Sequence, residues 1–234
     1  MLDALNVGYE QLRLNAVEYP PDSPSRPKPP LNIRVTGPQR VVNLRLIAPA
    51  TMAMNEQLVL GTVGVINTIY KQAGIRFVLK GGQIERMEGV SQTFSAKNID
   101  HLRTRQDINR QTTCATIFFA TDIYNNDDIS IPGVAVSHHS IVGGTIGAVQ
   151  EKLAYAVVRI RPAPITGAIG ETMAHELGHV IATLGDSSNK SCLMYQVGRD
   201  ADNLNAAEVY WLRHPPVGGV DNPPPANKSR FFAN

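Results

Sequence analysis

A strand, a helix and a second strand follow one another between residues 41 and 80, and this succession limits the chain to few architectures. Residues 41–48 read VVNLRLIA, which alternates and is rich in branched side chains, as a strand is. Residues 55–74 have apolar side chains at helical spacing and end at Gly74, a residue that commonly follows a helix. Residues 75–80, IRFVLK, read as a second strand. Two strands joined in this way predict a parallel pair with a right-handed crossover.

Three further segments read as strands because they alternate or stay apolar over a short length. They are TTCATIFFATDI (112–123), PGVAVSHHS (132–140) and AYAVVRI (154–160). We expect one helix over residues 96–110 and another over residues 167–184, where Thr166 can act as the N-cap and Gly185 can end the helix. The pattern therefore predicts a mixed, mostly parallel sheet with packed helices.

The segment at 167–184 contains the motif HELGH at residues 175–179. His175 and His179 are four residues apart, so they lie on one helix face with Cβ atoms about 5–6 Å apart and can reach one metal ion. Glu176 follows the first histidine and can take a proton from water on the open side of that ion. Zinc held by three protein ligands lowers the pKa of water towards about 7 and polarises a carbonyl group. The spacing predicts a catalytic zinc site with Glu176 as the general base.

The alternative reading of HELGH is a surface pair of side chains on an amphipathic helix. By chance we expect the motif in under about one such chain in a hundred. The surrounding segment is strongly apolar, with Met173, Leu177 and Ile181 among its side chains. A helix this apolar is expected to be buried, and buried charges need a metal ion or polar partners. We therefore favour the metal site.

Such a site needs a third protein ligand, and the residues leave more than one candidate open. Glu208, in NAAEVYWLRH, could supply a glutamate from a later helix. Asp186 follows Gly185, a residue that readily makes a turn, and could return to the metal soon after the helix. His138 and His139 are further options, but a solvent-facing pair at a strand end accounts for them, and we leave them out.

The region that follows the motif resembles a known family. HELGH with GDSSNKSCLMY after it is similar to the metzincin metallopeptidases, particularly their matrixin-like and snapalysin-like members, and the match is specific over residues 171–196. Their pattern is HExxHxxGxxH or HExxHxxGxxD, followed by a methionine-bearing turn (the Met-turn) beneath the zinc. The resemblance implies Asp186 as the third zinc ligand and Met194 as the turn methionine. The family glycine is Ala182 here, so we expect the helix to run about one turn further and Gly185 to make the bend.

The resemblance also implies a fold and an activity. The fold is α+β and metzincin-like, with a twisted mixed five-stranded sheet, a backing helix and an active-site helix. The activity is that of a zinc-dependent endopeptidase that hydrolyses peptide bonds with zinc-activated water and with Glu176 as general base. A peptide substrate is expected to pair antiparallel with an edge strand at residues 133–138, and Tyr195 to line the specificity pocket. The family favours an extracellular location, although residues 1–16 have no signal-peptide pattern.

Two other functions stay open. The chain could be a non-catalytic zinc-binding or interaction protein with a metalloprotease-like fold, or a protease that acts as a secreted toxin or effector. Glu176 argues against a purely structural zinc site. Such a site would need no general base and would usually close with four protein ligands.

The composition is that of a globular protein. Hydrophobic residues make up 43% of the 234 residues, charged residues make up 18%, and the formal net charge is +2. This charge is too small to indicate nucleic acid binding, and no run of eighteen apolar residues indicates a membrane span. We expect a monomer that binds a protein or peptide substrate and neither nucleic acid nor a membrane.

Two proline-rich stretches, residues 19–30 and 214–229, predict where one domain begins and ends. We expect an N-terminal extension with a proline-rich linker over residues 1–40. The zinc metallopeptidase domain would cover residues 41–215, and a proline-rich C-terminal tail residues 216–234.

Three smaller features have two readings each. The run NNDD at 125–128 could bind calcium, although a solvated turn explains it better. Cys114 and Cys192 could form a disulfide or remain buried free thiols. Asp3 or Asp22 could block the zinc from the N-terminal segment, as in some zymogens of the family, but ordinary surface residues are the simpler reading.

Overall fold

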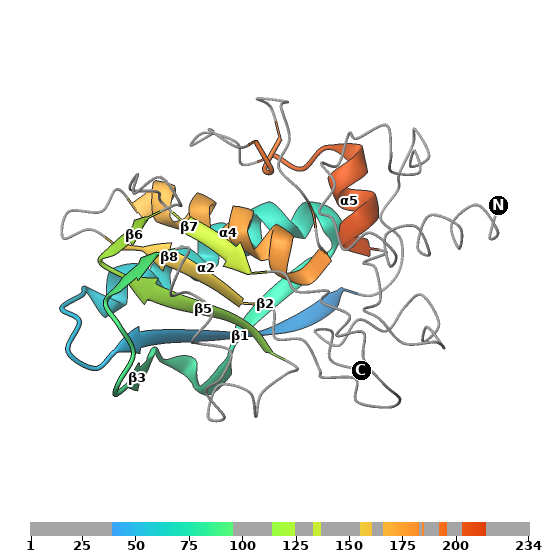
Figure 1. Ribbon diagram of the computed structural model, residues 1–234. Coiled ribbons are helices and arrows are strands. Elements are labelled where there is room, and N and C mark those ends of the chain that lie inside the picture. Colours follow the sequence, from blue (N-terminus) through green and yellow to red (C-terminus); the bar gives the residue numbers. More distant parts are fainter. Residues whose placement is uncertain are drawn as a thin grey trace, which may run out of the picture.

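The computed structural model describes residues 39–95, 114–124, 133–136, 155–160, 166–182, 184, 192–195 and 203–213, with the backbone alone for 134–136 and 166–168. Its elements, which Figure 1 shows, are β1 (Arg40–Pro49), α2 (Glu56–Tyr70), the 3-10 helix η1 (Lys71–Ala73), β2 (Ile75–Leu79), the 3-10 helix η2 (Lys80–Gly82), β3 (Glu85–Met87), β4 (Thr93–Ser95), β5 (Cys114–Ala120), β6 (Asp122–Tyr124), β7 (Gly133–Val136), β8 (Tyr155–Arg159), α4 (Thr166–Ala182) and α5 (Ala206–Arg213).

The main sheet is twisted and mostly parallel, with the strand order β2-β1-β5-β8-β7 (Figure 1). Every pairing along this order is parallel except the last, in which β7 runs antiparallel to β8. Strand β3 also pairs parallel with β1, at Ile47–Pro49, beyond the Arg40–Leu44 stretch that pairs with β2. In the described part of the chain the sheet has six strands, one more than the five expected, because β2 and β3 follow each other along one side of β1. The expected α+β fold with a mixed sheet is confirmed.

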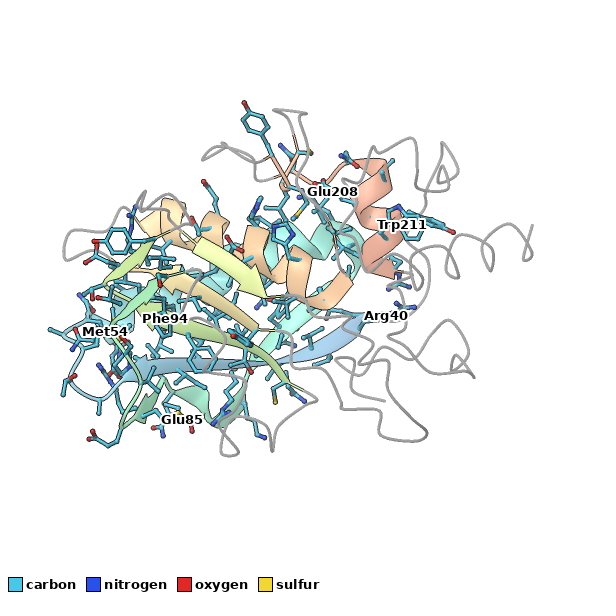
Figure 2. All side chains as sticks on the ribbon, viewed as in Figure 1. Arg40, Met54, Glu85, Phe94, Glu208 and Trp211 are labelled. Carbon is cyan, nitrogen blue, oxygen red and sulfur yellow. The ribbon has the colours of Figure 1, made fainter. Side chains whose placement is uncertain are left out.

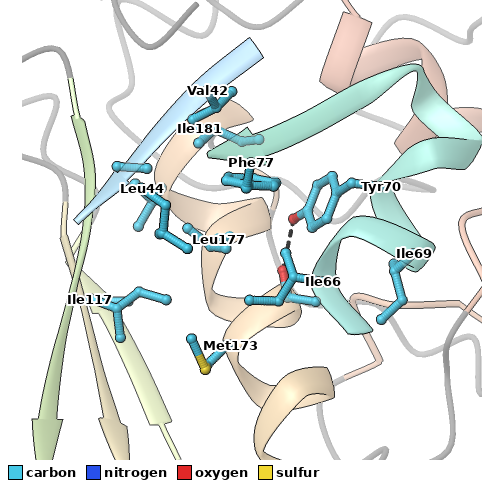
Figure 3. Packing of buried hydrophobic residues seen from close by; sticks show 14 of the residues in the cluster. Val42, Leu44, Ile66, Ile69, Tyr70, Phe77, Ile117, Met173, Leu177 and Ile181 are labelled. Carbon is cyan, nitrogen blue, oxygen red and sulfur yellow. Dashed lines mark hydrogen bonds between the residues drawn. The ribbon is translucent and has the colours of Figure 1, made fainter. Parts of the chain in front are cut away.

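Alternation along each strand sends side chains into two apolar cores, one on either face of the sheet. In β5, Ile117 belongs to the core beneath the helices, whereas Phe118 belongs to the core on the other face. All seven residues of β5 are buried, as expected for a central strand covered on both sides. Phe94 of β4 and Ile123 of β6 lie in the second core. Figure 3 shows the first core, in which Leu177 of α4 packs among side chains from the sheet and from α2.

Helix α2 is fixed at both ends by local chemistry. The side chain of Asn55 accepts a hydrogen bond from the backbone N–H of Leu58 at 3.2 Å, which makes it an N-cap. Gly74 ends η1 with a left-handed backbone, at φ 64°, a conformation that favours glycine. The Asn67 side chain accepts from the Phe77 N–H at 2.7 Å and donates to the Phe77 carbonyl at 3.1 Å. Because β2 ends the strand order, this amide covers backbone groups at the edge of the sheet.

Helix α4 packs on α2 and on the same face of the sheet (Figure 1). The helices approach closely at Gly170, where an added Cβ atom would lie 2.8 Å from the Cβ of Val65. One hydrogen bond also joins them, because the buried Tyr70 hydroxyl donates to the Ala174 carbonyl at 2.7 Å (Figure 3). Helix α4 is thus held by both packing and a polar contact at the turn before HELGH.

The end of α4 differs from the expectation. The helix ends at Ala182, so the prediction that it continues through Leu184 is wrong. The Leu184 N–H instead donates to the Gly178 carbonyl at 3.3 Å, and the Leu184 carbonyl receives a hydrogen bond from a histidine ring, as described below. These two contacts turn the chain back onto the helix and stop its regular continuation. Gly185, the expected bend, lies outside the described residues.

Several predictions concern residues that the structure does not describe. They include the helix at 96–110, the NNDD run and both proline-rich stretches. Cys114 and Cys192 are both described and buried, and neither forms a disulfide, which agrees with the thiol reading. No helix in the described part of the chain is long and apolar enough to cross a membrane.

Candidate metal centre

The two histidines of HELGH face each other from successive turns of α4. Their Nε2 atoms are 3.2 Å apart, and their ring planes lie at 80°. Nδ1 of His175 lies 2.9 Å from the carbonyl oxygen of Leu193, and Nδ1 of His179 contacts the carbonyl oxygen of Leu184. A carbonyl only accepts hydrogen bonds, so each Nδ1 carries a proton, and a neutral ring then turns an unprotonated Nε2 towards the other.

This arrangement leaves two lone pairs directed into one small space. When both rings are neutral and carry their protons on Nδ1, the two Nε2 atoms, 3.2 Å apart, are both acceptors. A cation between the rings removes the repulsion between the two Nε2 lone pairs. Two nitrogen ligands at 2.0–2.1 Å from a tetrahedral zinc ion are about 3.3–3.4 Å apart, close to the separation found here. Carbonyl partners at Nδ1 are the usual means of orienting metal-binding imidazoles, so the residues present fit a zinc ion.

Glu176 lies between α4 and the edge of the sheet. Its side chain is 6% exposed, and it packs against the backbone of Gly133 in β7. A Cβ atom at position 133 would lie 2.5 Å from Oε1 of Glu176 and 3.0 Å from its Cδ and Cγ. The edge strand expected from the sequence is thus next to the proposed general base, at the end of the strand order. The motif alone gave no sign that Gly133 would matter.

A tight turn at residues 192–195 contacts His175 through the Leu193 carbonyl. The Tyr195 N–H donates to the Cys192 carbonyl at 3.1 Å, and the Leu193 N–H donates to the Asn203 carbonyl at 2.9 Å. Met194 is fully buried. Its sulfur packs on the helix at Gly178, where an added Cβ atom would lie 2.5 Å from Sδ.

Gly178 therefore allows the turn to reach the helix between the two histidines. Tyr195, the expected pocket residue, is half-buried.

Glu208 is fully buried at the start of α5 and braces this turn (Figure 2). One carboxylate oxygen accepts from the Met194 N–H at 2.8 Å, and the other accepts from the Asn205 N–H at 2.7 Å. Asn205 returns the contact, because its side chain accepts from the Glu208 N–H at 2.9 Å. Both oxygens are thus engaged by backbone donors, which gives Glu208 a different role from the ligand that we considered. The spacing Asn-x-x-Glu before an apolar run is a capping-box signal and could have revealed it.

Burial changes the proton affinities of this region. It raises the pKa of Glu208, and the hydrogen bonds from Asn205, Met194, Cys192 and Leu193 oppose that shift without cancelling it. Burial, and next the negative charge of Glu208, raise the pKa of Tyr70 well above its ordinary value. The Tyr70 hydroxyl therefore stays protonated and available as the donor to α4.

The third ligand implied by the family resemblance is not among the described residues. Asp186 lies outside them, as do His138 and His139. Within the described part of the chain, no group of three or more histidine, cysteine, aspartate or glutamate side chains could hold a metal ion. The described part of the site consists of the two imidazoles, Glu176 and the turn at residues 192–195.

Comparison with known proteins bears on the fold. A search of the sequence against protein-family models and against curated proteins finds no match. Among solved structures, metalloproteinase-II from Bacteroides fragilis is similar, with a TM-score of 0.50 and 15% identity over 74% of this chain and 52% of that chain. Archaemetzincin from Methanopyrus kandleri has a TM-score of 0.47 and 16% identity over 73% of this chain and 93% of that chain.

The chain spans about half of the length of the Bacteroides protein. At this level of identity the similarity concerns the fold, and the metallopeptidase fold expected from the sequence is confirmed. The closer resemblance to matrixin-like or snapalysin-like members stays a prediction.

Proposed function

We propose that this protein is a zinc-dependent endopeptidase. The observation that carries the proposal is the pair of Nε2 atoms, 3.2 Å apart, with both Nδ1 atoms at backbone carbonyls. Two imidazoles held in this way are arranged to receive a metal ion. His175 and His179 are two of the zinc ligands in this proposal, and Asp186 is the third, on the basis of the family resemblance.

Zinc held in this way would lower the pKa of water towards about 7 and polarise a substrate carbonyl group. Glu176 supplies the proton transfers: its carboxylate takes a proton from the attacking water and delivers it to the leaving amine. Its low exposure supports this role, because a carboxylate shielded from bulk water exchanges protons with the groups placed beside it. Three protein ligands leave one position on a tetrahedral ion open for the reaction.

Other features support the same proposal. The fold is similar to that of a metalloproteinase, and an edge strand, β7, lies beside Glu176. An extended peptide can add to such an edge through main-chain hydrogen bonds. Met194 supports the histidines from below, and Tyr195 contacts the substrate side chain. Protein or peptide is therefore the substrate class.

The substitution Glu176→Gln tests the proposal, because glutamine keeps the size of the side chain but cannot take up the proton. We expect the zinc affinity to stay within a few-fold of the wild type, while hydrolysis of a peptide library falls by about 100-fold or more. Zinc binding is measured by competition with a chromophoric chelator, and cleavage by mass spectrometry. A wild type that binds zinc but cleaves nothing in the library would instead identify a non-catalytic zinc protein.

A further inference from the structure

The contact between Gly133 and Glu176 joins the sheet edge to the candidate site. Gly133 is the first residue of β7, and it pairs with Val158 of β8, so the sheet fixes its backbone position. Glu176 is fixed on the opposite side by α4, which packs on both strands. The carboxylate therefore lies between two rigid elements.

An added methyl group at position 133 would force the Glu176 side chain to shift. The Cβ atom would lie 2.5 Å from Oε1, and also 3.0 Å from both Cδ and Cγ. At 3.0 Å, Cδ and Cγ would have to give way by a few tenths of an ångström, and Oε1 by more. All three of these nearest atoms belong to the Glu176 side chain, so this side chain is the group that would move.

We propose that Gly133 is a positioning residue, and that its missing side chain sets the place of the Glu176 carboxylate at the sheet edge. This inference rests on the proposed function only for its effect on catalysis, since the contact itself is independent of any reaction. A general base must lie within hydrogen-bonding reach of the water from which it takes a proton. A displacement of about 1 Å can cost about 100-fold in rate.

The variant Gly133→Ala tests the proposal, with Gly64→Ala as the matched control. Gly64 is an exposed glycine of α2, and an added Cβ atom there would meet nothing within 4 Å. We expect Gly133→Ala to lower kcat on a peptide substrate by about 10- to 100-fold, with KM and zinc affinity within about 2- to 3-fold of the wild type. Gly64→Ala should leave all three unchanged.

A spectroscopic measurement separates this inference from the proposed function. The 13C resonance of the Glu176 side-chain carboxyl can be assigned in the metal-free protein by its loss in Glu176→Gln. It should shift in Gly133→Ala and stay in place in Gly64→Ala. If no peptidase activity is found in the wild type, this shift still decides whether Gly133 positions the carboxylate. An unchanged resonance together with an unchanged kcat overturns the proposal.

A stability cycle covers the case in which Gly133→Ala folds poorly. Glu176→Ala removes the atoms that the new methyl group would meet. Gly133→Ala should therefore lower the unfolding midpoint less in the Glu176→Ala background than in the wild type. An equal loss in both backgrounds would mean that β7 does not tolerate the methyl group for a reason unrelated to Glu176, and the proposal would be wrong.

Discussion

The two halves of the helical layer are held together in different ways. Around α2, the contacts are those of a common α/β unit: an Asn55 cap, a glycine after the last turn and apolar packing between the helix and the parallel strands. Around α4, buried polar groups are concentrated, among them Glu176, His179 and Glu208. Glu176 contacts the edge strand β7 and Glu208 contacts the Met194 turn, so these two contacts join distant parts of the chain.

The local contacts around α2 stabilise the fold, whereas the buried polar contacts around α4 form the candidate site. A buried polar group costs free energy unless it has partners, so the α4 half is stable only if several long-range contacts form together. The buried hydroxyls of α2, on Thr62 and Tyr70, have their partners within the helical layer, so the α2 half tolerates changes at its exposed positions. Substitutions of the same kind should therefore have opposite consequences in the two halves.

The largest effect is expected from removing an imidazole in the α4 half. His179→Ala should lower zinc affinity by about 100-fold or more, since it removes a ligand, and loss of a group that merely orients a ligand already costs 10- to 100-fold. The control is His101→Ala, a histidine outside HELGH. Competition with a chelator measures both. Equal zinc affinities for the two variants would contradict the assignment of the metal centre to α4.

A glycine-to-alanine pair gives the sharpest contrast between the helices. Gly178→Ala would place Cβ 2.5 Å from Sδ of the buried Met194, and we expect a net loss of about 1–3 kcal/mol in the free energy of unfolding. Gly64→Ala meets no atom within 4 Å in α2 and should gain up to about 1 kcal/mol from helix propensity. Urea denaturation measures both. If the free energy of unfolding changed in the same direction in both variants, the contrast between α4 and α2 would be contradicted.

A polar contact in the α2 half should matter for stability but not for metal binding. Asn67→Ala leaves the Phe77 N–H and carbonyl without their side-chain partner, at a cost of about 1–3 kcal/mol. Zinc affinity should match that of the wild type. A loss of zinc affinity in this variant would show that the two halves are not separable.

The smallest effect concerns the pH dependence of the α5 brace. Because burial raises the pKa of Glu208 in the folded state, the folded protein holds this proton more tightly than the unfolded chain. The resulting stabilisation is complete at acid pH and is lost as the pH rises through the raised pKa, with a slope of at most about 1.4 kcal/mol per pH unit.

Glu208→Gln cannot titrate, so the stability of the wild type relative to this variant should fall as the pH rises. Urea denaturation of the metal-free proteins at a series of pH values tests the sign. A difference that grows with pH would mean that burial does not dominate the proton affinity of Glu208.

The sequence allowed the fold to be predicted where periodicity carries the information. The strand at 41–48, the helix at 55–74 and the strand at 75–80 correspond to β1, α2 and β2 within a few residues. The main error concerned the end of α4, where the expected extension does not occur. A carbonyl contact with His179 competes with the helix there, and local propensity carries no sign of such a contact.

The candidate site was only partly accessible from the sequence. HELGH pointed to His175, Glu176 and His179 because their spacing on one helix is local. Gly133 was read only as part of a strand, and Glu208 was considered as a ligand. Their contacts join segments separated by more than ten residues, through backbone groups that every residue possesses. Residue type alone therefore does not reveal these roles.

X-ray absorption spectroscopy at the zinc edge of the zinc-loaded wild type tests the central claim most directly. The account predicts two imidazole nitrogen ligands and oxygen ligands at about 2.0–2.2 Å, with no sulfur. His179→Ala should lose one imidazole contribution or fail to bind zinc. A sulfur ligand at about 2.3 Å, from Cys114 or Cys192, or a spectrum without imidazole, would contradict the assignment of a catalytic zinc site to α4.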